Sequence, residues 1–171
     1  MKQDIDIALM FRIVTDVLNN DLATVQAKVA NDFDYSRLFL LKPVKLERAY
    51  DIVNKTYKEM ADDHQRTVNI QYWDERETYL NEALAAPATP EQQKALQKEL
   101  AHVIEKKRER FMRIASPTGP PDWSYEIRSL AHLLLRILRA KDRRDEVEHD
   151  LAQQIETLFR ARIAETIRPE I

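Results

Sequence analysis

Apolar residues recur every three or four positions along most of this chain, the spacing that gathers them on one face of an α-helix. Four blocks carry the pattern: residues 3–31, 44–85, 90–115 and 123–167. Within the first block, the polar triplet Asn19-Asn20-Asp21 predicts a short turn, with Asp21 as the N-cap of a second helix. The pattern therefore predicts an all-α fold: a somewhat elongated up-and-down bundle of five or six helices, forming a single domain over residues 1–171.

The second and third blocks are separated by a proline-bounded connection. Thr89 is placed as an N-cap and Pro90 fits the first helical position, so a new helix is expected there, after a hinge at residues 86–89. A straight helix over residues 44–85 would be about 60 Å long, longer than a compact globule of this size. If that helix bends, residues 67–72 are the expected place, because β-branched and polar residues alternate there.

The fourth block has the widest apolar face in the chain, and we expect its first half to be the most buried helix. The face consists of aliphatic residues: Ile127, Leu130, Leu133, Leu134, Leu135, Ile137 and Leu138. Leu130, Leu134 and Leu138 should lie at the centre of the core. Asp122 or Ser124 is expected to cap this helix. The polar stretch at 139–146 favours a break into two helices over one continuous helix, with Asp142 able to cap the second.

Composition removes several classes of function. Glycine occurs once, at Gly119, and tight phosphate-binding loops need glycine. The absence of cysteine excludes disulfides, thiolate metal sites and a cysteine nucleophile. No apolar stretch is long enough to span a membrane, so a cytoplasmic protein with no membrane association and no cofactor is expected.

Three residues with potential site chemistry fall at positions where burial is the simpler interpretation. His64 lies on the apolar seam of its block and is expected to be a hydrogen-bonded core residue. Trp73 and Trp123 flank block ends and are expected to anchor a core or an interface. His132 lies opposite the centre of its apolar face and carries no signal of a site.

Two Glu-x-x-His pairs, Glu99 with His102 and Glu146 with His149, have the spacing used by di-metal carboxylate bundles. Both histidines, however, project about 200° away from the apolar residue at the centre of their own helix face. A metal site in a bundle core needs inward-facing ligands. We therefore expect no metal.

Arg144 and His149 have the Arg-x4-His spacing, with the polar Asp145 after the arginine. In this motif and its all-helical setting the chain resembles the HEPN superfamily, many of whose members are metal-independent ribonucleases. The resemblance implies that Arg144 steadies a scissile phosphate and that His149 acts as general acid or base.

Positive charge is concentrated in residues 105–144, which hold 11 basic and 5 acidic residues, although the whole chain has a net charge of −2. Candidate partner-binding residues in this basic region end two helical blocks: Lys106, Lys107, Arg110, Arg113, Arg136, Arg139, Lys141 and Arg143. Basic residues also favour helix C-termini for dipole reasons alone. A nucleic-acid interface would usually be more basic and carry exposed aromatic residues, so a protein partner is favoured.

These observations predict a non-enzymatic helical interaction protein of adaptor or regulatory type, which binds a protein partner or itself as a homodimer. The first alternative is a HEPN-like ribonuclease or toxin component that uses Arg144 and His149. The second alternative is nucleic-acid binding through the basic region 105–144.

Overall fold

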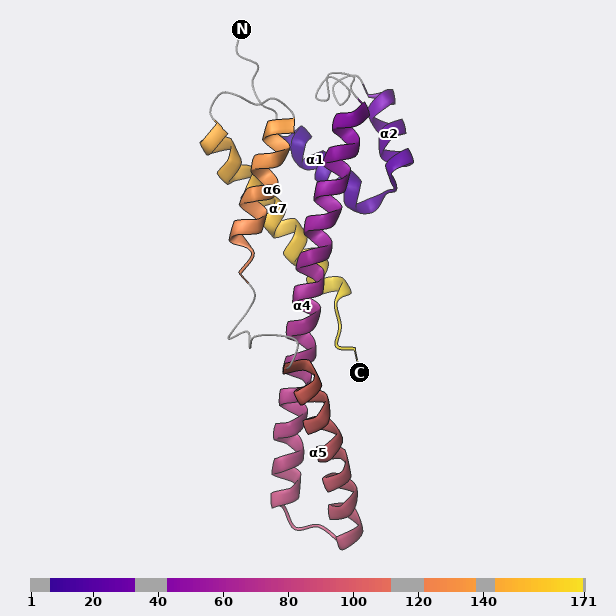
Figure 1. Ribbon diagram of the computed structural model, residues 1–171, viewed down its shortest axis with the longest axis vertical. Coiled ribbons are helices and arrows are strands. Elements are labelled where there is room, and N and C mark those ends of the chain that lie inside the picture. Colours follow the sequence, from indigo (N-terminus) through magenta and orange to yellow (C-terminus); the bar gives the residue numbers. More distant parts are fainter. Residues whose placement is uncertain (1–6, 33–42, 112–121, 138–143, 171) are drawn as a thin grey trace. The chain divides into compact units, whose positions relative to one another are not determined.

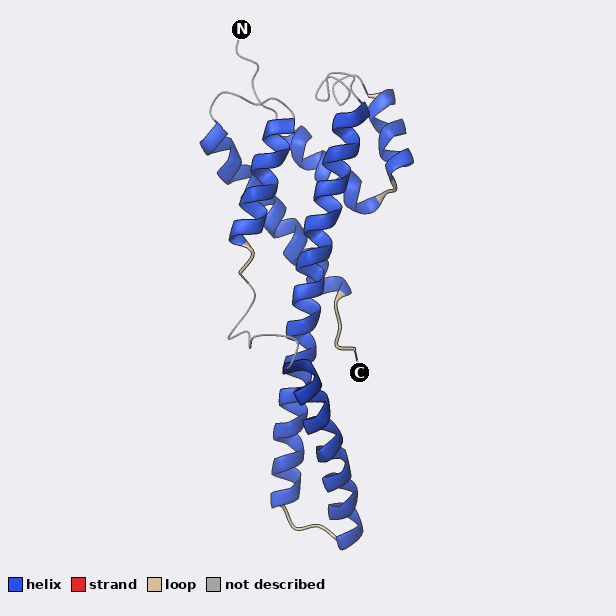
Figure 2. Cartoon of the chain, viewed as in Figure 1, coloured by secondary structure: helices blue, strands red, loops and turns tan. Residues whose placement is uncertain are grey.

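A computed structural model describes residues 7–32, 43–111, 122–137 and 144–170. Within these ranges the chain forms six helices and no strand, and about 90% of the structure is helical (Figures 1 and 2). The helices are α1 (Ile7–Asn19), α2 (Leu22–Asn31), α4 (Pro43–Ala85), α5 (Pro90–Phe111), α6 (Ser124–Ile137) and α7 (Arg144–Thr166). The predicted all-α bundle is confirmed, and residues 67–72 are helical within α4.

The chain divides into two compact units. Unit 1 comprises residues 1–61 and 122–165, and unit 2 comprises residues 62–121 and 166–171. Helix α4 contributes its first part to unit 1 and its second part to unit 2. A single domain over residues 1–171 stays a prediction.

Two predicted N-caps are present with their hydrogen bonds. The Asp21 carboxylate accepts a 2.8 Å hydrogen bond from the Thr24 amide, and the hydrogen bonds from Thr24 lower the pKa of Asp21. At the start of α5, the Gln92 amide donates to Thr89 Oγ1 and the Thr89 amide donates to Gln92 Oε1, each at 3.2 Å. This reciprocal pair is a capping box, which satisfies two amide donors that the helix leaves open.

The core of unit 1 is built around α6, in which six of 14 residues are buried. Leu130 and Leu134 lie at its centre as predicted, whereas Leu138 lies outside the described residues. Helix α7 contributes Phe159, which is fully buried and meets the Tyr57 ring edge-on at a centroid distance of 5.2 Å. Trp123 is also buried, and the Arg160 guanidinium lies 4.8 Å from its ring centroid.

Helices α6 and α7 are separate, as the polar stretch at 139–146 predicted. His132 on α6 and Glu148 on α7 are 16 residues apart, and His132 Nδ1 lies 3.1 Å from Glu148 Oε2. One straight helix would separate these residues by about 24 Å at 1.5 Å per residue. Helices α6 and α7 are therefore not parts of one straight helix. The proposed cap Asp142 lies outside the described residues.

Unit 2 is a helical hairpin in which the second part of α4 runs antiparallel to α5, joined by the non-helical residues 86–89 (Figure 1). Its small core contains Trp73, Leu80 and Val103, with partly buried residues packed around it: Tyr72, Leu96 and Leu100. Charged side chains join the two helices along their edges. Arg76 pairs with Glu99, and Lys107 pairs with both Asp74 and Glu77.

The hairpin's ion pairs also shift the ionisation of its cations. The pKa of Lys107 is raised by its hydrogen bonds to Asp74 and Glu77, and the pKa of Arg76 is raised by its hydrogen bond to Glu99. Both cations therefore stay charged at neutral pH. His64, at the start of this unit, is half-buried within α4.

Candidate functional site

The first turn of α6 is fixed by hydrogen bonds around Asp122. Its carboxylate accepts from the Ser124 amide at 3.0 Å and from the Ser124 hydroxyl at 2.6 Å. These bonds, with the nearby charge of Arg160, lower the pKa of Asp122. Of the two predicted caps, Asp122 supplies the carboxylate, while the Trp123 carbonyl accepts the first helical bond from Ile127 at 3.0 Å. Tyr125, which follows Ser124 in this first turn, is exposed at the surface.

One face of α6 carries the residues of an open groove of about 810 Å³. Its lining runs from the capping turn along α6 to α7: Asp122, Ser124, Tyr125, Arg128, Ser129, His132, Leu133 and Glu148. Five of the lining residues share one face of α6 at 3-1-3-1 spacing: Tyr125, Arg128, Ser129, His132 and Leu133. Tyr125 is 80% exposed, and Arg128 lies one turn further along the same face. We call this surface the Tyr125 groove.

The His132–Glu148 pair closes one end of the lining. A carboxylate can only accept, so the 3.1 Å contact assigns the imidazole proton to Nδ1 when Glu148 is ionised. In the neutral ring with its proton on Nδ1, Nε2 is an acceptor. With Tyr125 and Arg128 as donors, the groove offers both kinds of hydrogen-bonding group beside an aromatic ring.

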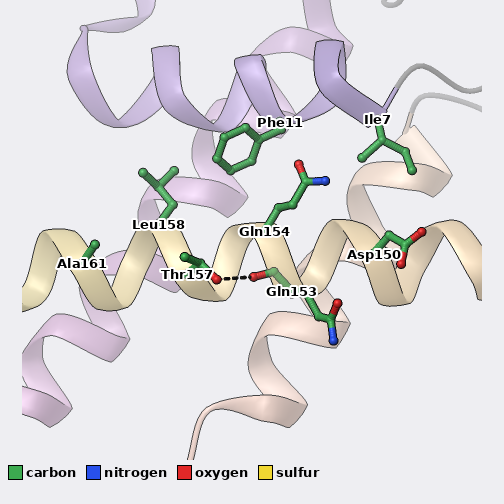
Figure 3. A pocket seen from close by; sticks show the side chains of 8 residues that line it. All are labelled: Ile7, Phe11, Asp150, Gln153, Gln154, Thr157, Leu158 and Ala161. Carbon is green, nitrogen blue, oxygen red and sulfur yellow. Dashed lines mark hydrogen bonds between the residues drawn. The ribbon is translucent and has the colours of Figure 1, made fainter.

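A second open groove, of about 530 Å³, lies between α1 and α7. Its lining combines apolar and amide side chains: Ile7, Phe11, Asp150, Gln153, Gln154, Thr157, Leu158 and Ala161. In Figure 3, Phe11 and Leu158 face the space between the two helices, and the Thr157 hydroxyl bonds to the Gln153 carbonyl at 2.9 Å. Compared with the Tyr125 groove, this lining has no cation and no aromatic hydroxyl.

The residues of the predicted basic region fall into different parts of the structure. Lys106 and Lys107 belong to unit 2, and both are paired with acids: Lys106 with Glu109 at 3.7 Å, and Lys107 with Asp74 at 2.7 Å. Arg136 is exposed on α6 in unit 1. The remaining side chains lie outside the described part of the chain: Arg110, Arg113, Arg139, Lys141 and Arg143. Binding by the whole basic region stays a prediction.

The residues of the HEPN motif lie on α7. Arg144 is its first residue, with a side chain outside the described part, and His149 is exposed. The roles that the resemblance implies for Arg144 and His149 at a scissile phosphate therefore stay a prediction.

The first Glu-x-x-His pair is engaged within the hairpin. Glu99 accepts from Arg76 Nε at 2.9 Å, and the His102 ring meets Trp73 edge-on at 6.1 Å between centroids. Among the described side chains, no group of three or more His, Asp or Glu residues is placed to hold a metal ion.

Comparison with known proteins gives no match: neither the family models, nor the curated proteins, nor the solved structures contain one for this chain. The helices in the described ranges include none that is long and apolar enough to cross a membrane.

The sequence alone does not predict the Tyr125 groove. His132 lies opposite the apolar face of its helix, and its pairing with Glu148 depends on how α6 and α7 pack. A usable signal was present, however. Tyr125, Arg128 and His132 recur at helical spacing on the face opposite the leucines, where a solvated helix more often carries Lys and Glu.

Proposed function

We propose that this protein is a non-enzymatic interaction protein of adaptor or regulatory type, and that it binds a protein partner or a second copy of itself through the Tyr125 groove. The observation that carries the proposal is the 80% exposure of Tyr125 at the rim of a groove that also contains Arg128. Tyrosine and arginine are the residue types most enriched at the energetic centres of protein interfaces.

The individual side chains of the Tyr125 groove have properties that suit a protein ligand. Tyr125 offers a large apolar surface with few rotatable bonds, so ordering it on binding costs little entropy. Arg128 can donate two parallel hydrogen bonds to a carboxylate, and the His132–Glu148 pair adds fixed polar groups. Asp122 and Arg128 are of opposite sign, which favours a partner of mixed charge over a polyanion such as nucleic acid.

Site-specific photocrosslinking tests the proposal. With p-benzoylphenylalanine in place of Tyr125, we expect crosslinks to a discrete protein partner or to a second copy in cells that express the chain. The matched control has the same group at Tyr79, an exposed tyrosine of the other unit. Equal crosslinking at the two positions would contradict a binding role for the groove.

Two arginine variants of α6 sharpen the same experiment. Arg128→Ala should lower the crosslink yield at position 125 by about tenfold, as expected for loss of an interface centre. Arg136→Ala should leave the yield unchanged, because Arg136 is exposed on α6 but does not line the groove. The reverse pattern would favour the basic region as the binding surface.

For the ribonuclease alternative we expect a negative result. Asp145, Glu146, Glu148 and Asp150 flank His149 in sequence, so a phosphodiester would meet four carboxylates within about two helical turns. Purified protein incubated with short RNAs in EDTA at neutral pH should show no cleavage above buffer. Cleavage that disappears in His149→Ala would make the HEPN-like activity the better proposal.

A further inference from the structure

A pair of amide side chains on α4 lies far in sequence from the Tyr125 groove and holds a non-helical stretch of chain. Gln65 and Asn69 are one helical turn apart, and Gln65 Nε2 donates to Asn69 Oδ1 at 3.0 Å. Asn69 is only 1% exposed, although it lies in the middle of a helix. A buried amide needs partners for its polar atoms. The second partner of Asn69 comes from residues 167–170.

Both amides contact main-chain atoms of this segment. Gln65 Nε2 donates to the Arg168 carbonyl at 2.6 Å, and the Glu170 amide donates to Asn69 Oδ1 at 2.8 Å. The carbonyl and the amide are separated by Pro169. Proline fixes its own φ near −65° and favours an extended residue before it, so such a segment is partly ordered before it binds. Gln65 and Asn69 therefore recognise a carbonyl and an N–H spaced two residues apart on an extended backbone.

Residues 167–170 cover the buried Asn69 side chain, but they make few contacts with it. Arg168, Pro169 and Glu170 are all exposed. The net contribution of two such hydrogen bonds is of the same order as the entropy cost of ordering the few residues that make them. Since the contacts to Gln65 and Asn69 are made by backbone atoms, another chain with the same backbone form can make them equally well.

We propose that Gln65 and Asn69 form a docking site for an extended, proline-containing peptide, and that residues 167–170 occupy this site as an internal ligand. The incoming peptide needs a carbonyl before its proline and an N–H after it, in the order that Arg168, Pro169 and Glu170 present. The site belongs to unit 2, and none of its residues lines the Tyr125 groove. It is thus a second binding site, independent of the function proposed above.

The test measures binding of a fluorescent peptide to the full chain by fluorescence polarisation. The probe is acetylated and amidated Thr-Ile-Arg-Pro-Glu, which matches residues 166–170. Binding to the unmodified chain should be weak, because the internal segment competes. Pro169→Gly in the protein should tighten peptide binding by about two- to fivefold, since the internal segment then loses more entropy on docking.

A matched chemical control keeps the protein unchanged. Methylation of the backbone amide nitrogen of the peptide's glutamate removes the N–H that would donate a hydrogen bond to Asn69 Oδ1. This change should weaken binding by about tenfold. Equal affinity of the two peptides, no effect of Pro169→Gly, or no binding to either protein would overturn the proposal. Failure here would leave the Tyr125 crosslinks untouched, because the two experiments involve different residues.

Discussion

Replacing Leu134 with alanine should lower the free energy of unfolding by about 2–5 kcal/mol. Leu134 is 2% exposed at the centre of the unit 1 core, so truncation removes apolar contacts and leaves a cavity that neighbouring helices fill only partly. Urea unfolding followed by circular dichroism at 222 nm measures the change.

The adjacent Leu133 provides the matched control for this experiment. It is the same residue type on the same helix, but it is only half-buried and lines the Tyr125 groove. Leu133→Ala should therefore cost less, about 1 kcal/mol. Equal losses at the two positions would mean that α6 does not present Leu134 to the core.

The second large effect is expected in the hairpin. Trp73→Ala should destabilise unit 2 by about 3–5 kcal/mol, since Trp73 is the largest of the buried residues that the structure describes in this core cluster. Amide hydrogen exchange should become markedly faster in α5, while α1, which belongs to unit 1, should keep its protection.

Tyr79→Ala is the control for the hairpin. Tyr79 lies on the same part of α4 but is 57% exposed, and its ring meets only the Arg76 guanidinium, 5.1 Å from the centroid, among the contacts described. Its removal should change stability by less than about 0.5 kcal/mol. Faster exchange throughout α1 in Trp73→Ala would show that the two units unfold together.

The helices, and the N-termini of α2 and α5, were predictable from the sequence because local chemistry determines them. Asp21 and Thr89 cap helices by bonding to amides three residues ahead, and the apolar spacing around Leu134 determines which face of α6 is buried. These features need no knowledge of what packs against the helix.

The binding surfaces were not predictable, because they depend on contacts between distant segments. The contact between His132 and Glu148 requires α6 and α7 to pack against each other. In the sequence Asn69 is an ordinary polar residue of a helix, and its burial depends on the contact with residues 167–170. The spacing of apolar residues predicts which face of a helix is buried, but it does not predict which segment of the chain packs against that face. The division into two units within α4 could not be predicted for the same reason, since no proline or glycine marks this position in the sequence.

Unit 1 is assembled from two stretches of chain separated by all of residues 62–121, and this order has a consequence for synthesis on the ribosome. The hairpin of unit 2 needs only neighbouring helices, so it can form as soon as α5 emerges. The apolar faces of α1 and α2 emerge first, yet the core they share with α6 and α7 cannot close until those last helices are made. During that interval the nascent chain exposes the apolar faces of α1 and α2, and it is then most accessible to chaperones and most prone to aggregation.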